Sequence, residues 1–261
     1  MSGIVTLLTD FGDKDAYVAE MKGVLLSLNP KLNIVDITHA IEPQDISHGA
    51  YVLGAVARRF PADTIHVAVV DPGVGSARKP LVVSHDLGLF IGPDNGLLTS
   101  IIARPGLRAI HEISNPNFVE PVVSRTFHGR DVFAPAAAHA SLGVDVDRLG
   151  PQVSDPVKIE QWMPEITTEG ATGQVIHIDR FGNLVTNINL ESFAGRTIQS
   201  ISVGECIVEE LSDTYSDVAS RSKLVLIGSQ DSLEISINGG DAAKELQVAR
   251  GDRVSVAWGQ S

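Results

Sequence analysis

Four clusters of polar residues and glycines in this sequence each adjoin a short apolar run. IVTLL at 4–8 leads into Asp10, IHVAVV at 65–70 leads into Asp71, LFI at 89–91 leads into GPDNG, and TFHGRD at 126–131 precedes a run of small residues. Apolar runs that end in Gly and Asp are typical of buried strands followed by loops. In open α/β sheets, ligands bind beyond the carboxyl ends of the strands. Several of these acid-bearing loops are therefore expected to converge on one site.

Each candidate in the first half of the chain also has a purely structural interpretation. Asp10 fits a carboxylate that accepts hydrogen bonds from a ribose diol, but also a helix N-cap or a turn acid. The segment from Asp71 to Gly75 fits a tight turn, and because GxGxxG and GxxxxGKS/T patterns are absent, no nucleotide-phosphate loop is predicted. Arg78 would then form only a surface ion pair with Asp71, which contributes little. A lone histidine such as His128 is more often structural than catalytic.

The second half offers a loop and several turns. Asp179, Phe181 and Asn183 fit either a hairpin turn or a ligand loop with a carboxylate, an aromatic face and an amide. The segments around Ser229 and Glu234 and the NGG at 238–240 also fit ordinary turns and an exposed strand.

Metal and thiol chemistry find little support in the sequence. The histidines are scattered and form no HExxH or HxH pattern, so no metal site is predicted. The single cysteine, Cys206, excludes an intramolecular disulfide and a Cys-rich zinc site. Because no His or acid motif surrounds it, Cys206 is not expected to act as a nucleophile.

The elements that would position these residues follow from hydrophobic periodicity. Strands are expected at 4–8, 33–37, 65–70, 81–84 and 89–91, and helices at 14–28, 45–59, 96–102 and 133–142. This alternation predicts an α/β layer domain with a largely parallel sheet over residues 1–150. Three prolines in 150–164 indicate a linker, placed at 151–170. Short alternating runs with turn signals over 171–261 predict a smaller β-sandwich or β-barrel domain.

Composition limits the classes of partner. The 261 residues are 43% hydrophobic and carry a formal net charge of −12, so neither a basic nucleic-acid surface nor attraction to an anionic membrane is expected. No apolar stretch reaches the ~18 residues of a membrane span. The chain starts on a strand-like run without the features of a signal peptide, which makes a cytoplasmic location the expectation.

Taken together and in order, six motifs carry a resemblance. LTDFGDKDAYVAEMKG, DPGVGSAR, GPDNGLL, TFHGRDVFAPAAA, DRFGNLVTNI and the C-terminal IGS…LEISINGGDAA resemble the S-adenosyl-L-methionine hydroxide adenosyltransferases, hydrolytic relatives of the fluorinase and chlorinase. The resemblance spans essentially the whole chain. It implies an N-terminal α/β domain, a smaller C-terminal β-barrel domain, and homotrimers with active sites between subunits.

The resemblance also implies an activity and a set of site residues. The implied reaction converts S-adenosyl-L-methionine and water to adenosine and L-methionine, with no cofactor and no metal. Its catalytic Asp–Arg–His triad carries over onto Asp71, Arg78 and His128. The implied substrate-binding residues, from the ribose carboxylate through the methionine ligands to the adenine side, are Asp10, Asp179, Phe181, Asn183, Ser229, Glu234, Asn238 and Ala242.

The implied mechanism is an in-line displacement at the ribose C5′. The sulfonium is already a good leaving group, so the protein must supply and orient the nucleophile and exclude bulk water. A lone carboxylate is a poor base for water. Arg78 and His128 are therefore expected to position the water or stabilise its hydroxide character, while Asp71 fixes their geometry.

Three alternatives stay open from the sequence. A 5′-halogenase is disfavoured because Asp71 would repel a halide, because His128 and Gly129 stand where the fluorinase has Tyr and Ser, and because the spacing from Pro93 to Thr126 leaves no room for the fluorinase's extra loop. A non-catalytic S-adenosylmethionine or adenosine sensor would bind without turnover. A metal-dependent hydrolase would lose its activity to a chelator.

Overall fold

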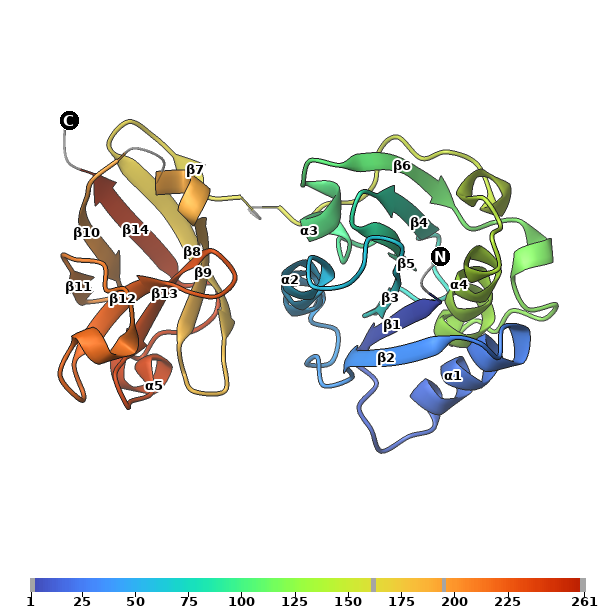
Figure 1. Ribbon diagram of the computed structural model, residues 1–261, viewed down its shortest axis with the longest axis horizontal. Helices are drawn as coiled ribbons and strands as arrows, with labels where there is room; N and C mark the ends of the chain where they lie inside the picture. The colour runs from blue at the N-terminus through green and yellow to red at the C-terminus, as the bar shows by residue number, and fades with distance from the viewer. Residues whose placement is uncertain (1–2, 161–162, 194–195, 259–261) are drawn as a thin grey trace. The chain divides into compact units, whose positions relative to one another are not determined.

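The computed structural model describes residues 3–160, 163–193 and 196–258 (Figure 1). The chain divides into two compact units, Met1–Glu160 and Gln161–Ser261, here called the N-terminal and C-terminal units. The division falls within the segment 151–170, where the sequence predicts a linker. Residues at the start of that segment still pair with the N-terminal unit, since the Glu112 N–H donates to the Pro151 carbonyl at 2.9 Å and the Val153 N–H to the Ile110 carbonyl at 2.8 Å.

The N-terminal unit contains one six-stranded sheet with the order β2-β1-β3-β5-β4-β6. Its strands are β1 Ile4–Thr9, β2 Asn33–Thr38, β3 Ile65–Val69, β4 Pro80–His85, β5 Gly88–Pro93 and β6 Leu107–Glu112. The pairs β1–β2, β1–β3 and β3–β5 are parallel, whereas β4 runs antiparallel to both of its neighbours. The largely parallel sheet predicted from the sequence is confirmed.

Helices cover both faces of this sheet, as Figure 1 shows. They are α1 Tyr17–Leu28, α2 Ile46–Ala57, α3 Thr99–Ile102 and α4 Ala134–Ser141, the last preceded by a π-helical turn, η2 Gly129–Phe133. Alternate side chains of the buried strands point to opposite faces. Val67 of β3 thus packs in the core under α1 and α4, while Ala68 packs in the core under α2 and α3.

The C-terminal unit contains an antiparallel sheet with the order β11-β10-β14-β8-β9-β13-β12, and β7 pairs with β8. The strands are β7 Glu165–Ile166, β8 Gly170–Ile178, β9 Leu184–Asn189, β10 Ile198–Val203, β11 Cys206–Val208, β12 Lys223–Ile227, β13 Ser232–Ile237 and β14 Arg253–Trp258, with the short helix α5 Ala242–Leu246. A bridge between Leu211 and Val225 joins the segment after β11 to β12, so the sheet nearly closes on itself. The predicted barrel-like second domain is confirmed.

Some elements differ from the expectation. The sequence does not predict the strand β6, because LRAIHE shows no clear alternation of apolar and polar residues; in the structure only Ile110 of this strand is buried. The first helix begins at Tyr17 rather than at residue 14, and Ala16 at its N-cap gives no side-chain hydrogen bond. Among the described residues, no helix combines the length and apolar character that crossing a membrane requires.

Candidate active site

The loop after β3 is folded back on itself by a tight turn. All five residues of β3 are buried, and Asp71 begins the turn by accepting the Val74 N–H at 3.2 Å. Gly75 has φ +77°, and a Cβ there would lie 2.3 Å from the Arg125 carbonyl oxygen. Only glycine fits such a left-handed position in close contact with another backbone. The tight turn that the sequence suggested for residues 71–75 is therefore present, and it places the Arg78 side chain against Asp71.

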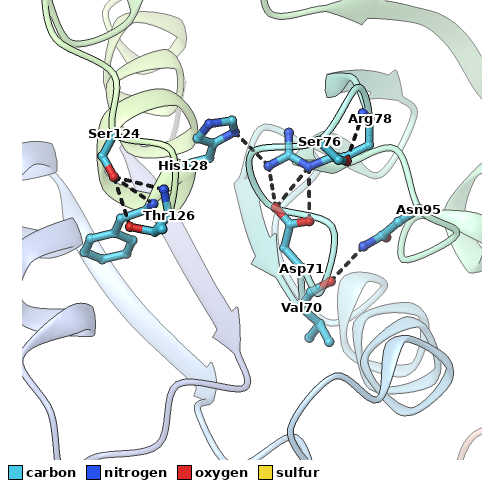
Figure 2. Close-up of polar contacts among 9 residues, drawn as sticks. Val70, Asp71, Ser76, Arg78, Asn95, Ser124, Thr126 and His128 are labelled. Carbon is cyan, nitrogen blue, oxygen red and sulfur yellow. Dashed lines mark hydrogen bonds and ion pairs between the residues drawn. The ribbon is translucent and has the colours of Figure 1, made fainter.

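Asp71 and Arg78 form a buried, bidentate ion pair (Figure 2). Arg78 Nε lies 3.0 Å from both carboxylate oxygens of Asp71, and Nη2 also contacts Oδ2. The side chains are only 8% and 4% exposed, and the guanidinium lies 5.5 Å from the ring centroid of Phe133. The alternative of a weak surface ion pair is therefore wrong, because the pair is buried. A bidentate contact between a guanidinium and a carboxylate is strong and holds both groups in one orientation.

His128 completes a contiguous row of three side chains. Its Nδ1 lies 2.8 Å from Arg78 Nη2. A guanidinium can only donate hydrogen bonds, so Nδ1 accepts and the neutral ring carries its proton on Nε2. Burial and the positive charge of Arg78 lower the pKa of His128, against the opposing effects of Asp71, Asp131 and a backbone hydrogen bond with Ser124. The contact geometry and the direction of this pKa shift both favour the neutral imidazole.

The backbone before His128 is ordered by its neighbours. Ser124 Oγ accepts the N–H groups of Thr126 at 3.0 Å and Phe127 at 3.1 Å (Figure 2). Asp131, which is 1% exposed, accepts the Ser124 N–H at 2.8 Å and pairs with Arg130 at 2.6 Å. These contacts fix where the chain enters η2.

One donor of the triad lacks a partner within the described part of the chain. Arg78 Nη1 is buried and makes no hydrogen bond there. An unsatisfied buried N–H of a permanent cation is costly. It is suited to an oxygen atom of a bound water or ligand, and it lies on the same guanidinium that Asp71 and His128 hold.

Asp10 lies at the carboxyl end of β1, the parallel neighbour of β3. One of its carboxylate oxygens, Oδ2, accepts the Gln44 N–H at 2.8 Å. Asp10 is thus not the N-cap of α1, because that helix begins seven residues later.

In the C-terminal unit, Asp179 builds the turn that the sequence suggested. Its Oδ1 accepts the N–H groups of Phe181 at 2.8 Å and Asn183 at 2.9 Å, and its Oδ2 accepts the Asn183 side-chain amide at 2.9 Å. Phe181 projects from this loop and is 75% exposed. Ala242 is buried at the start of α5, next to Ala243, whose N–H donates to the Gly182 carbonyl at 3.0 Å. The structure therefore gathers four of the expected residues around one loop.

The other expected residues of this unit lie around β13. Ser229 is exposed in the β12–β13 turn, and a Cβ on the preceding Gly228 would lie 2.8 Å from Glu234 Oε2. Glu234 is not on an exposed strand but 8% exposed, and its Oε1 accepts Tyr215 Oη at 2.5 Å. Asn238 instead anchors a neighbouring loop by donating to the Val218 carbonyl at 2.9 Å.

Two contacts of the site were missed by sequence reasoning. Tyr215 lies in the segment between β11 and β12, and no local pattern in the sequence links it to Glu234. Asn95 lies in the GPDNG motif, and its side chain donates to the Val70 carbonyl at 2.9 Å, a contact that the motif alone does not indicate. In the described ranges, no group of three or more His, Cys, Asp or Glu side chains is arranged to hold a metal ion.

Comparison with known families accounts for both units. The model of the SAM hydroxide adenosyltransferase N-terminal domain matches residues 5–150, and that of the SAM hydroxide adenosyltransferase C-terminal domain matches residues 173–255. Together these matches span most of the chain.

Individual relatives agree with the family models. A protein named (R)-S-adenosyl-L-methionine hydrolase from Salinispora tropica is 38% identical over 260 residues, which is 98% of each chain. A fluorinase from Nocardia brasiliensis is 29% identical over 213 residues and 71% of each chain. The solved structure of an uncharacterized conserved protein from Thermotoga maritima aligns with a TM-score of 0.89 and 34% identity, covering 97% of this chain and 99% of that one.

Proposed function

The chain belongs to the SAM hydroxide adenosyltransferase family, and we propose that it hydrolyses S-adenosyl-L-methionine to adenosine and L-methionine. Support for the overall reaction comes from the hydrolase relative, which matches nearly the whole chain at higher identity than the fluorinase. Support for the chemistry comes from one observation, the buried and unpaired Nη1 of Arg78 beside Asp71 and His128.

The proposed reaction is a single displacement. The oxygen of a water molecule forms a bond to C5′ of the ribose, the C5′–sulfur bond breaks, and its electron pair neutralises the sulfonium. One proton of the water is released to the solvent, so the products are adenosine, methionine with a neutral sulfur, and a proton. No metal and no organic cofactor is needed, because the leaving group already carries the positive charge that activates it.

Arg78 is assigned the central role at the entering oxygen. Its Nη1–H is free to donate to the water and to stabilise the negative charge that develops as the proton leaves, a preorganised effect worth about 10²–10³ in kcat for one donor. Asp71 fixes the guanidinium through both carboxylate oxygens. Neutral His128 holds the other edge of the guanidinium by accepting from Nη2. Protonation of His128 would remove that acceptor, so turnover is expected to fall in acid.

The substrate-binding roles remain those that the resemblance implies. Asp10 would hold the ribose diol and Asp179 the methionine ammonium, with Phe181 and Asn183 at the adenosine. Ser229 would bind the methionine carboxylate, and the adenine-side segment comprises Glu234, Asn238 and Ala242. The Phe181 ring is 75% exposed, so its face is accessible to a ligand.

Assembly and location are part of the same proposal. We place the active site between subunits of a homotrimer, with Asp71 from one subunit and Asp179 from its neighbour, and the enzyme in the cytoplasm. Light scattering of the purified protein tests the trimer, and cell fractionation tests the location.

A halide in place of water is the nearest alternative reaction. The charge argument against it is weaker than the sequence suggested, because Arg78 compensates the Asp71 carboxylate. What favours water is the closer similarity to the hydrolase. Adding chloride or fluoride to the assay distinguishes the two, since a halogenated adenosine would overturn the choice of water.

The direct test incubates purified protein with S-adenosyl-L-methionine, in parallel with and without a chelator, and follows adenosine and methionine by chromatography. Both sulfonium epimers are supplied separately, because the relative's name specifies the (R) form. Equal amounts of both products, absent with Arg78→Ala and His128→Ala, support the proposal. Saturable binding without products would refute it in favour of a sensor, and loss of activity to the chelator would indicate a metal enzyme.

A further inference from the structure

The side chain of Asn95 ties together the ends of two neighbouring strands. Asn95 lies two residues beyond β5, and its Nδ2 donates to the backbone carbonyl of Val70, one residue beyond β3, at 2.9 Å (Figure 2). Its Oδ1 accepts the Leu97 N–H at 3.1 Å. The second contact fixes the orientation of the amide, so that its donor faces Val70.

The Val70 carbonyl lies where the regular sheet has ended. The β3–β5 ladder stops at the pair Val67–Ile91, and the β1–β3 ladder stops at Thr9–Val69. Val70 itself is fully buried. A buried carbonyl needs a hydrogen-bond donor, and Asn95 supplies it from a side chain.

This contact acts directly on the residue that follows. The Val70 carbonyl and the Asp71 nitrogen belong to the same planar peptide, so holding the carbonyl fixes the plane in which the Asp71 N and Cα lie. The hydrogen bond from the Val74 N–H to the Asp71 carbonyl limits the remaining rotation, and together the two contacts set where the Asp71 side chain leaves the backbone. Asp71 in turn holds Arg78 Nε, and Arg78 Nη2 reaches His128 Nδ1. One unbroken series of contacts thus runs from Asn95 to the imidazole.

We propose that Asn95 is a positioning residue for the Asp71–Arg78–His128 triad and acts through the Val70–Asp71 peptide. Its catalytic consequence rests on the proposed hydrolase function. Its effect on the geometry of the three side chains is independent of that function.

The chain offers a matched control in the neighbouring residue. Asp94 Oδ1 accepts the Val157 N–H at 2.8 Å, a comparable side-chain contact to a backbone group that leads away from Asp71. Asp94→Ala therefore measures the effect of losing an ordered contact in the same loop. Asn95→Asp is a second probe, because it keeps an acceptor for Leu97 but loses the donor to Val70.

The experiment compares full-length wild type, Asn95→Ala, Asn95→Asp and Asp94→Ala. Two quantities are measured on each folded protein, the kinetics with S-adenosyl-L-methionine and the pKa of His128 by NMR titration, assigned with His128→Gln. We expect both Asn95 variants to lose about 10- to 100-fold in kcat with KM changed less than about threefold, since small misplacement of catalytic groups has effects of this size. We expect the pKa of His128 to rise toward its ordinary value as Arg78 is released, and Asp94→Ala to leave both quantities near wild type.

The outcomes separate the two claims. Wild-type kcat and an unchanged His128 pKa in the Asn95 variants would overturn the positioning role, as would equal effects from Asp94→Ala. If Asn95→Ala does not fold, Asn95→Asp decides. If the wild type does not turn over the substrate, the proposed function fails, while the His128 titration still decides whether Asn95 positions the triad.

Discussion

Replacing Arg78 by alanine would leave the Asp71 carboxylate buried without its cation. The guanidinium contacts both oxygens of a carboxylate that is 4% exposed, and it also holds His128. Removing one member of a buried pair costs roughly 3–5 kcal/mol of unfolding free energy, mostly because the remaining charge has lost its compensation. We therefore expect Arg78→Ala to destabilise the N-terminal unit by about that amount.

The double variant Asp71→Ala/Arg78→Ala distinguishes this cause from simple loss of packing. With both charges gone, no uncompensated charge remains, so the double variant is expected to cost less than the sum of the two single variants, with a coupling of about 1–3 kcal/mol. Arg78→Lys keeps a positive charge beside Asp71 but cannot form the several hydrogen bonds that the planar guanidinium makes to both carboxylate oxygens. It is expected to retain most of the stability while losing about 10²-fold or more in kcat.

The assay must report on the correct unit. Trp258 packs in the core of the C-terminal unit, and no tryptophan precedes residue 161, so unfolding of the N-terminal unit is better measured by calorimetry and by circular dichroism in urea. Single-variant costs that simply add, or an Arg78→Ala cost below about 1 kcal/mol, would refute a tight buried pair.

Three further predictions follow from other features. Burial lowers the pKa of His66 from 6.5 to about 4, so the unfolded chain takes up a proton at a higher pH than the folded chain does. The free energy of unfolding is therefore expected to fall by about 3 kcal/mol as the pH drops from 6.5 to about 4. A flatter calorimetric pH profile in His66→Gln checks this prediction. Gly75→Ala forces a Cβ against a backbone carbonyl and should lower the free energy of unfolding by more than about 1 kcal/mol and remove most of the turnover. Gly143→Ala, at a glycine of positive φ in open space, should keep its activity. Co-expressed Asp71→Ala and Asp179→Ala subunits should recover roughly a quarter of wild-type activity if sites lie between subunits, and none if each site belongs to one chain.

The convergence of strand ends could be predicted from the sequence. Asp10, Asp71 and Asn95 follow β1, β3 and β5, which run parallel and adjacent, and this arrangement follows from apolar runs alternating with helical periods. The barrel-like second unit was predictable for a similar reason, because short alternating strands leave a strong local pattern. The edge strand β6 could not be predicted, since a half-exposed edge strand accepts both polar and apolar side chains and so leaves no clear pattern in the sequence.

The contacts within the site depended on tertiary packing that no local pattern encodes. That Arg78 and Asp71 are buried follows from Phe133 beneath the guanidinium and from the Arg125 backbone against Gly75, both far away in sequence. The partnership of Tyr215 with Glu234 likewise joins a loop and a strand without any sequence signal. Motif order identified the family, whereas burial and hydrogen-bond partners had to come from the structure.

The measurement that tests the central claim most directly is turnover of S-adenosyl-L-methionine in water enriched in a heavy isotope of oxygen, followed by mass spectrometry of both products. Attack of water on C5′ places the label in the 5′-hydroxyl of adenosine and leaves L-methionine unlabelled, with the signal lost in Arg78→Ala. Unlabelled adenosine, label in the methionine product, or binding without any product would contradict the account.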